Sequence, residues 1–246
     1  MSLYGLVYLS AVVLYLLCPL LPAVSARYGT LITRLPQVSC VGLGAILGGR
    51  LGYVLCYEPH WYSQHLGEIP QLWRGGMSFF GGVLGVCCAV FLSCGTLRRA
   101  LSELDLIALL ALLIIPLGRI VNFLNGELWG TPSTLPWAVI FEGADELPRH
   151  PVQLYEALTE GPLLALFIYL LYPRLKRRCG AVALCYLAGY AAFRLIMECW
   201  REPDAAVGYL PGQLSLGQYL CLTALLVCAL LWRFLPEEIP GTKSGS

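Results

Sequence analysis

Long apolar stretches separated by short polar connections make up most of the chain. A stretch of about 20 predominantly apolar residues is long enough to cross the hydrocarbon core of a bilayer as an α-helix. The pattern therefore predicts an all-α polytopic integral membrane protein, with residues 1–246 forming a single transmembrane domain. The seven predicted spans are Leu3–Val24, Val38–Tyr57, Met77–Leu97, Leu104–Leu124, Val152–Tyr172, Cys179–Trp200 and Leu214–Leu235.

Lysines and arginines alternate between the connections and predict the orientation. Ten of the 16 lie in the connections and ends expected on one side, including Arg98-Arg99 and Arg174–Arg178, and only three lie on the other side. Because cytoplasmic loops carry the excess of basic residues, the N-terminus is predicted outside and the C-terminus in the cytoplasm. Residues 131–149 would then form a small periplasmic cap loop, and residues 241–246 a flexible tail.

The first apolar stretch admits another interpretation, because Ala23-Val-Ser-Ala26 resembles a signal-peptidase site. No basic residue precedes the stretch, however, and it is longer than the apolar region of a signal peptide. We therefore expect a retained first helix.

Composition supports a membrane protein and narrows the range of partners. Hydrophobic residues make up 58% of the chain and charged residues 13%, about half the share of about 25% in soluble domains. With a net charge of +1 and no basic groove, no nucleic-acid partner is expected. The 11 cysteines include no Cys-x-x-Cys pair and no Cys/His cluster with metal-binding spacing, so no metal or other cofactor is expected.

The segment Gly118–Gly130 places Arg119, Asn122, Asn125 and Glu127 at the end of an apolar stretch. A charged group next to hydrocarbon costs a few kcal/mol and usually faces the protein interior. Arg119 and Asn122 share a helix face, and Asn125-Gly126 predicts a turn that lets Glu127 fold back. This pattern favours a pocket for an anionic head group clamped by Arg119. The alternative is a buried Arg–Glu pair that only locks helices together.

A second polar group follows the sixth apolar stretch. Its members, spaced four, four and three residues apart along one helical stripe, are Tyr190, Arg194, Glu198 and Arg201. Glu156 and Glu160 also share a helix face, and one of them is expected to pair with an intramembrane arginine. Two arginines on two helices suit the phosphate diester of a lipid. Arg50, within a glycine-rich span, could pair structurally or contact a ligand.

These motifs resemble the signature of the prolipoprotein diacylglyceryl transferase family. The resemblance rests on Gly118–Gly130, Gly75–Phe79, Arg149–Glu156, Gly189–Arg194 and Arg201–Asp204. It covers nearly the whole chain and implies a multi-pass enzyme of the bacterial inner membrane, with its active site toward the periplasmic half. Such an enzyme transfers the diacylglyceryl group of phosphatidylglycerol to the lipobox cysteine thiol of a lipoprotein precursor, whose signal peptide it binds, and releases glycerol phosphate.

The resemblance also implies the roles of individual residues. The expected catalytic residues are Arg119, Arg194, Tyr190 and Glu198. The expected substrate-binding residues are Tyr4, Asn122, Asn125, Glu127, Gly130, Glu156, Arg201 and Phe80.

Two positions depart from the family pattern. The family has a histidine where this chain has Phe80, and a small residue where it has Val121. Phenylalanine cannot move a proton, which leaves Tyr190, Glu198 and His150 as candidates for that step. A cysteine thiol is nevertheless intrinsically nucleophilic, and clamping the developing phosphate charge is usually the larger catalytic contribution. Three hypotheses stay open: a divergent transferase, a paralog that binds phospholipid or lipoprotein without turnover, and a transferase with a different acceptor.

Overall fold

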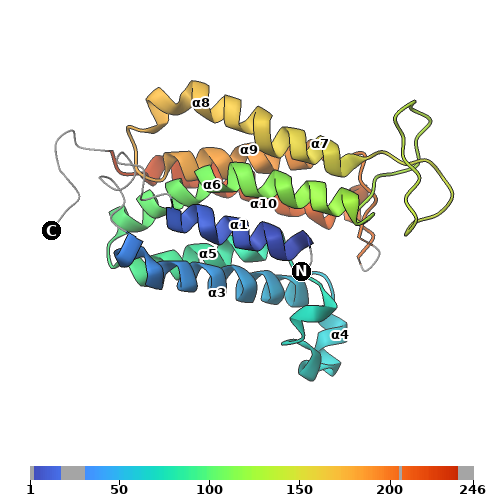
Figure 1. The fold of residues 1–246 in the computed structure, drawn as a ribbon, viewed down its shortest axis with the longest axis horizontal. Helices are drawn as coiled ribbons and strands as arrows, with labels where there is room; N and C mark the ends of the chain where they lie inside the picture. The colour runs from blue at the N-terminus through green and yellow to red at the C-terminus, as the bar shows by residue number, and fades with distance from the viewer. Residues whose placement is uncertain (1–2, 18–30, 205–206, 238–246) are drawn as a thin grey trace. The chain divides into compact units, whose positions relative to one another are not determined.

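The computed structural model describes residues 3–17, 31–204 and 207–237, and these residues are mostly helical (Figure 1). The helices are α1 (Leu3–Leu17), α3 (Leu31–Cys56), α4 (Pro59–Gln64), α5 (Phe79–Cys94), α6 (Leu97–Leu124), α7 (Val152–Leu158), α8 (Leu164–Leu175), α9 (Ala181–Met197) and α10 (Leu216–Leu231). A short antiparallel pair, β1 (Tyr209–Leu210) and β2 (Leu214–Ser215), precedes α10. The Tyr4 side chain and the tail 241–246, both subjects of predictions, lie outside the described residues.

Four described helices are long and apolar enough to cross a membrane. They cover Gln37–Cys56, Leu97–Leu124, Val152–Leu175 and Leu216–Phe234. The prediction of a mostly helical chain with several apolar spans is confirmed, with four of the seven predicted spans present as long apolar helices among the described residues. Helices α5 and α9, with 16 and 17 residues, are shorter than the spans predicted there. At α5 the reason is local. The hydroxyl of Ser78 caps the first turn, and Gly95, in the left-handed region with φ 65°, ends the helix.

The described residues form two units, one built around Tyr15–Leu104 and the other around Asp105–Asp204 together with α10. In the first unit, α3 and α5 pack closely through facing glycines. A Cβ added to Gly48 would lie 2.7 Å from the Cα of Gly85, and one added to Gly52 would lie 2.7 Å from the Cα of Gly81. The absence of side chains at these positions therefore lets the two helices approach closely.

Replacing Gly48 with alanine should therefore destabilise the α3–α5 pair. The new methyl group would meet backbone atoms of α5, which cannot rotate away, and overpacking of this kind costs about 1–3 kcal/mol. Gly42→Ala is the matched control, because a Cβ on Gly42 meets nothing within 4 Å. Thermal unfolding of both variants in detergent tests the expectation, which fails if the two variants melt at the same temperature.

Arg50 has a structural role in the first unit. Its buried guanidinium donates to the backbone carbonyls of Glu68 at 2.9 Å, Ile69 at 2.7 Å and Gly75 at 2.6 Å. The group also lies over the ring of Tyr62, 5.1 Å from its centre. Arg50 thus ties the connection after α3 to that helix, which favours the structural alternative over ligand contact. The connection itself contains α4 and two short 3₁₀ turns.

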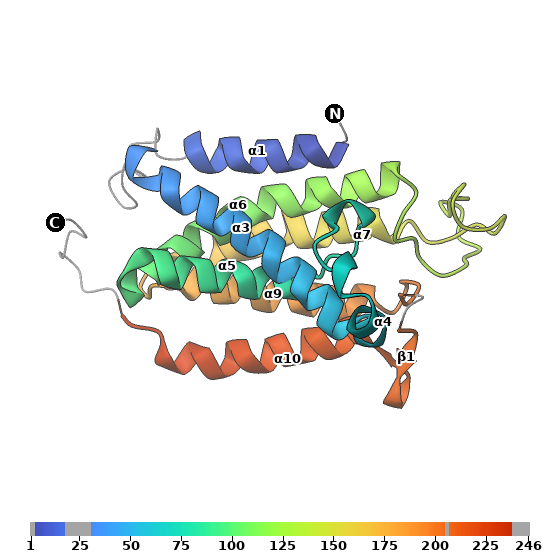
Figure 2. The ribbon, with the colours of Figure 1, turned by 90° about the horizontal axis from the view of Figure 1, so that it is seen from below.

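In the second unit, α9 packs against both α8 and α10, and Figure 2 shows α10 beside α9. The N-terminus of α9 is held by the buried carboxylate of Asp105, which accepts from the backbone N–H groups of Gly180 at 2.8 Å and Ala183 at 2.9 Å. Between α7 and α8, a π-helical turn at Thr159–Leu163 continues the same helical path. Gly161 in this turn allows close contact with Pro116 of α6.

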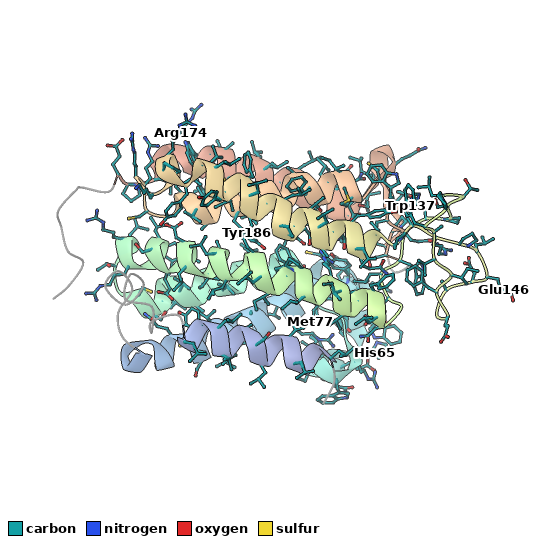
Figure 3. All side chains as sticks on the ribbon, turned by 45° about the horizontal axis from the view of Figure 1, so that its top comes forward. His65, Met77, Trp137, Glu146, Arg174 and Tyr186 are labelled. Carbon is teal, nitrogen blue, oxygen red and sulfur yellow. The ribbon has the colours of Figure 1, made fainter. Side chains whose placement is uncertain are left out.

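Residues 131–149 form the loop beyond α6 that carries Trp137 and Glu146 (Figure 3). Asp145, one of the acidic residues of this loop, forms an ion pair. Arg149 is buried, pairs with Asp145 at 2.7 Å and also pairs with Glu202. The hydrogen bonds from Arg149 lower the pKa of Asp145. Arg149 is the last residue of the loop before α7, so its ion pairs hold that end of the loop in place.

Candidate active site

The buried carboxylate of Glu156, on α7, is the centre of a polar cluster in the second unit. It has no exposed surface and pairs with Arg119 at 3.1 Å, with Arg201 at 3.3 Å and with Arg194. Arg119 comes from the last turns of α6 and Arg194 from the last turn of α9. One carboxylate thus joins Arg119 to two arginines, Arg194 and Arg201, that lie far from it in the sequence.

Arg119 uses all three guanidinium nitrogens within the cluster. Its Nε and Nη2 donate to the two oxygens of Glu160 at 2.9 and 3.3 Å, and its Nη1 faces Glu156. The same Nη2 donates to the hydroxyl of Tyr190 at 3.0 Å. One of the two glutamates was expected to pair with an intramembrane arginine, and the structure shows that both do. This two-point contact with Glu160 fixes the plane of the guanidinium.

Arg194 and Arg201 share a second carboxylate, that of Glu198. The Nη2 of Arg194 lies 2.5 Å from Glu198 Oε1, and the Nε of Arg201 lies 3.8 Å from the same oxygen. Glu198 and Arg201 follow the end of α9 rather than lying within it. The predicted single helical stripe is therefore wrong in its second half, although its four side chains do face one cluster.

Two residues that sequence reasoning missed hold Glu198 from α10. The hydroxyl of Ser215 donates to Glu198 Oε2 at 2.5 Å. Gly217 leaves room for the carboxylate, because a Cβ there would lie 2.8 Å from its carbon. Ser215 also caps α10 in a capping box with Gln218. A Ser-x-x-Gln signal at the start of the last apolar stretch was visible in the sequence, but it points only to a helix start.

The end of the Gly118–Gly130 segment contacts Arg201 through its backbone. The helix ends at Leu124 and Gly126 has φ 64°, so the predicted turn is confirmed. Leu128 also adopts a left-handed conformation, with φ 60°, and its carbonyl lies 3.5 Å from Nη1 of Arg201. Gly130 forms a bridge with Arg201, and a Cβ there would lie 2.6 Å from the carbonyl oxygen of Trp200.

The remaining candidates make contacts of other kinds. Asn125 donates to the carboxylate of Glu127 at 2.7 Å, and the backbone N–H of Glu127 donates to the carbonyl of Asn122. His150 lies 3.5 Å from the hydroxyl of Tyr155. Phe80 belongs to the unit built around Tyr15–Leu104, where it lies in the first turn of α5 with its ring edge-on to that of Phe79.

The charges of the cluster balance one another. Among the described residues it contains three arginines and three glutamates, and each of them is at most 13% exposed. Buried ion pairs gain little net stability over apolar packing, and removal of one partner is costly. An incoming phosphate must therefore compete with the carboxylates for the arginines. The geometry alone suits both a phosphate clamp and a structural lock.

Comparison with known proteins identifies the family. Residues 1–234 match the model of the family described as prolipoprotein diacylglyceryl transferase. The chain is 45% identical over 236 residues to the phosphatidylglycerol–prolipoprotein diacylglyceryl transferase of Cupriavidus metallidurans, covering 93% of this chain and 86% of that protein. It is 48% identical over 198 residues to the protein of the same name from Nitrosomonas europaea, covering 78% and 70%. On these matches, the chain belongs to the prolipoprotein diacylglyceryl transferase family.

Proposed function

We propose that the protein transfers the diacylglyceryl group of phosphatidylglycerol to the lipobox cysteine thiol of lipoprotein precursors and releases glycerol phosphate. The supporting observation is the buried cluster in which Arg119 and Arg194 converge on Glu156. It occurs in a chain that is 45% identical to a relative named for this reaction.

The reaction is a displacement at carbon. The cysteine sulfur attacks the glycerol carbon that bears the phosphate, the carbon–oxygen bond breaks, and glycerol phosphate leaves with the electron pair. The thiol proton passes to a base or to the departing phosphate. Arg119 and Arg194 would stabilise the negative charge that grows on the phosphate, and their planar forks suit its oxygens.

The carboxylates and Tyr190 would position the two arginines. Glu156 contacts both guanidinium groups and keeps them near one point. Tyr190, which is 1% exposed, receives a hydrogen bond from Arg119, and Glu198 holds Arg194 from the other side. Tyr190 and Glu198 also remain the candidates in the cluster for moving a proton. The lipid would be bound beside them by Asn122, Asn125, Glu127, Gly130 and Arg201, whereas Tyr4 and Phe80 remain substrate-binding candidates on the family resemblance alone.

Replacing Arg119 with lysine should lower the transfer rate at least roughly tenfold, about 1.4 kcal/mol of transition-state stabilisation. Lysine keeps the charge but lacks the planar guanidinium group, whose three nitrogens contact Glu156, Glu160 and Tyr190 at the same time. Arg119→Ala should be slower still. Initial rates at saturating phosphatidylglycerol provide the measurement. Normal turnover of the lysine variant would mean that Arg119 only locks the helices.

The proposed setting is the bacterial inner membrane, crossed seven times with the N-terminus outside and the C-terminus in the cytoplasm. The cluster would then lie in the periplasmic half, where the signal peptide of a secreted precursor presents its cysteine. The support is the distribution of basic residues, because Arg174–Arg178 lie at the opposite end of α9 from Arg194.

A cysteine introduced at Glu142 should react with a membrane-impermeant maleimide in intact cells. A cysteine introduced at Lys176 should react only after the cells are permeabilised. Because the chain already has 11 cysteines, the labelled peptide has to be identified by mass spectrometry. The reverse pattern would place the cluster in the cytoplasmic half and contradict the proposed orientation.

The direct test is turnover by the purified protein. Phosphatidylglycerol and a lipobox peptide should yield glycerol phosphate and a thioether-linked product in equal amounts. A peptide with serine in place of the lipobox cysteine is the control and should yield neither. Lack of product with an intact, folded protein would contradict the proposed function.

Phe80 supports a second candidate function. A phenylalanine where the family has a histidine removes the usual proton acceptor, and loss of a general base costs roughly 10²–10⁴-fold in rate. The chain could instead bind phospholipid or lipoprotein without turnover, or serve a different acceptor. Saturable binding of the lipobox peptide without product formation would favour the first of these alternatives.

A further inference from the structure

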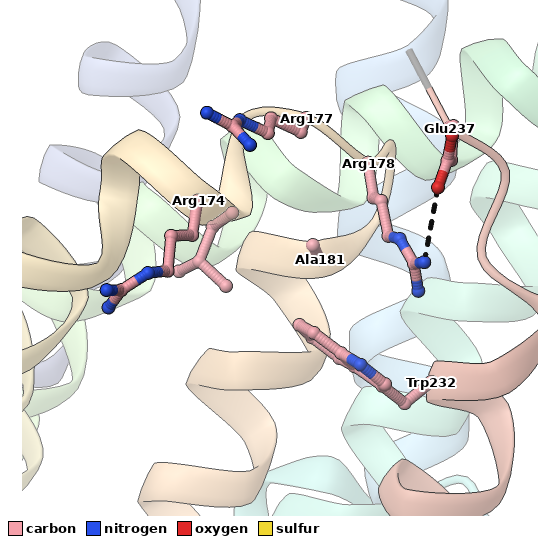
Figure 4. A pocket seen from close by; sticks show the side chains of 7 residues that line it. Arg174, Arg177, Arg178, Ala181, Trp232 and Glu237 are labelled. Atoms are coloured by element: carbon pink, nitrogen blue, oxygen red, sulfur yellow. Dashed lines mark hydrogen bonds and ion pairs between the residues drawn. The ribbon is translucent and has the colours of Figure 1, made fainter.

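A second polar site lies at the opposite end of α9 from the arginine–glutamate cluster. It is a cavity of about 630 Å³ (Figure 4), lined by Arg174, Leu175, Arg177, Arg178, Ala181, Trp232 and Glu237. Ala181 and Arg194 are 13 residues apart on one helix, or about 20 Å at 1.5 Å per residue. The cavity is therefore separate from the proposed active site.

The cavity is located where two candidate membrane spans end. The span that includes α8 ends at Leu175, and the span that includes α10 ends at Phe234. The bilayer interface is expected at this level, and tryptophan is enriched there because its ring is apolar and its N–H is polar. Trp232, in the 3₁₀ turn after α10, is 40% exposed. The cavity thus opens at the depth of lipid head groups.

Positive charge in the cavity is only weakly neutralised. Among the described residues, Arg174 and Arg177 form no ion pair. Arg178 pairs with Glu237 at 3.4 Å, but that carboxylate is 78% exposed, and such surface pairs contribute little. Figure 4 shows the guanidinium groups of Arg174 and Arg177 pointing away from this pair. Three arginines against one glutamate leave a net charge of +2.

The cavity also has an apolar side. Leu175 and Ala181 are among its lining residues, and they are 5% exposed and fully buried, respectively. A ligand that fits this lining must be anionic at one end and apolar at the other.

We propose that this cavity binds the phosphate group of an anionic phospholipid in the leaflet at this end of the helices. Basic pockets between transmembrane helices bind such head groups, and each arginine near the surface contributes about 1 kcal/mol. The proposal is independent of the transferase reaction. The competing explanation is that the arginines act only as topology signals, in which case no saturable site exists.

The test uses native mass spectrometry of the full-length protein in neutral detergent, titrated with dioleoyl phosphatidic acid. The wild type should bind one more lipid than R174Q/R177Q, whose affinity at this site should fall about fivefold per arginine, or roughly 25-fold in all. R99Q/R233Q is the matched control, because it removes two exposed arginines that do not line the cavity. Equal melting temperatures check that all three proteins are folded.

Four further outcomes decide the proposal. Equal binding by the wild type and R174Q/R177Q would overturn it, as would an equal loss in R99Q/R233Q. Equal binding of phosphatidylcholine with the same acyl chains would overturn the requirement for an anionic head group. Glycerol phosphate serves as the soluble probe. If it displaces the additional lipid of the wild type at concentrations similar to those of the lipid, the site takes phosphate from solution, which would overturn the proposal of a lipid ligand.

Discussion

Replacement of Glu156 with glutamine should destabilise the protein by about 3–5 kcal/mol, the cost of removing one partner from a buried ion pair. Glu156 has no exposed surface and faces three arginines. The neutral amide leaves three buried cations with only two carboxylates, Glu160 and Glu198. We also expect a large loss of transferase activity, because Arg119 and Arg194 lose the group that holds them together.

Glu160→Gln is the matched control for this prediction. Glu160 is equally buried and lies one helical turn away, but the only arginine with which it pairs among the described residues is Arg119. Its replacement should therefore cost less stability than that of Glu156. Thermal unfolding in detergent and initial rates measure both effects. If both variants melt alike, Glu156 is not the centre of the cluster.

A histidine at position 80 should raise transferase activity if the rest of the protein is a working transferase. The substitution restores the family's imidazole, and a general base contributes roughly 10²–10⁴-fold. Activity should also acquire a new dependence on pH near the ordinary imidazole pKa of about 6.5. The expected change is a gain of function, which damage to the fold does not produce.

The neighbouring substitution Phe79→His controls for the chemistry of the side chain. Phe79 and Phe80 are ring partners, 5.4 Å apart at their centres, in the same turn of α5. Because successive residues of a helix point in different directions, an imidazole at position 79 should not replace the family's histidine. If Phe80→His brings lower stability and no gain, that site has been repacked around the aromatic ring, which favours the binding paralog or a different acceptor.

Hydrophobic pattern predicted the helices well and their ends less well. The start at Val152 and the end at Leu124 are confirmed, because polar turn residues adjoin the apolar stretches there. Helix α6 begins at Leu97, earlier than the predicted Leu104, since a helix continues through its charged first turns once the apolar part is anchored. The apolar pattern alone does not predict that α5 begins after Ser78 and ends at Gly95, the two capping residues that make it shorter than the apolar stretch.

Spacing within one segment also predicted part of the cluster. It correctly indicated that Arg119 and Arg194 face the protein interior, because a charge in an apolar stretch must find partners. It could not indicate which helices meet. The contact of Ser215 with Glu198 joins residues of different elements and depends on tertiary packing. The sequence likewise could not indicate the partners of Arg50, because the carbonyl groups that accept its hydrogen bonds are positioned by the conformation of a loop.

The π-helical turn at Thr159–Leu163 lets the helix containing α7 and α8 tolerate a change of one residue in its length. Such a turn accommodates one residue more than an α-helix, so deleting one residue there should convert it into an ordinary α-helical turn and leave α8 facing the core as before. Leu164 and Ile168, now almost fully buried, would stay buried, whereas a deletion within α8 itself would rotate the residues beyond it by about 100°. Relatives should therefore vary in the number of residues at this turn more readily than within the helices on either side.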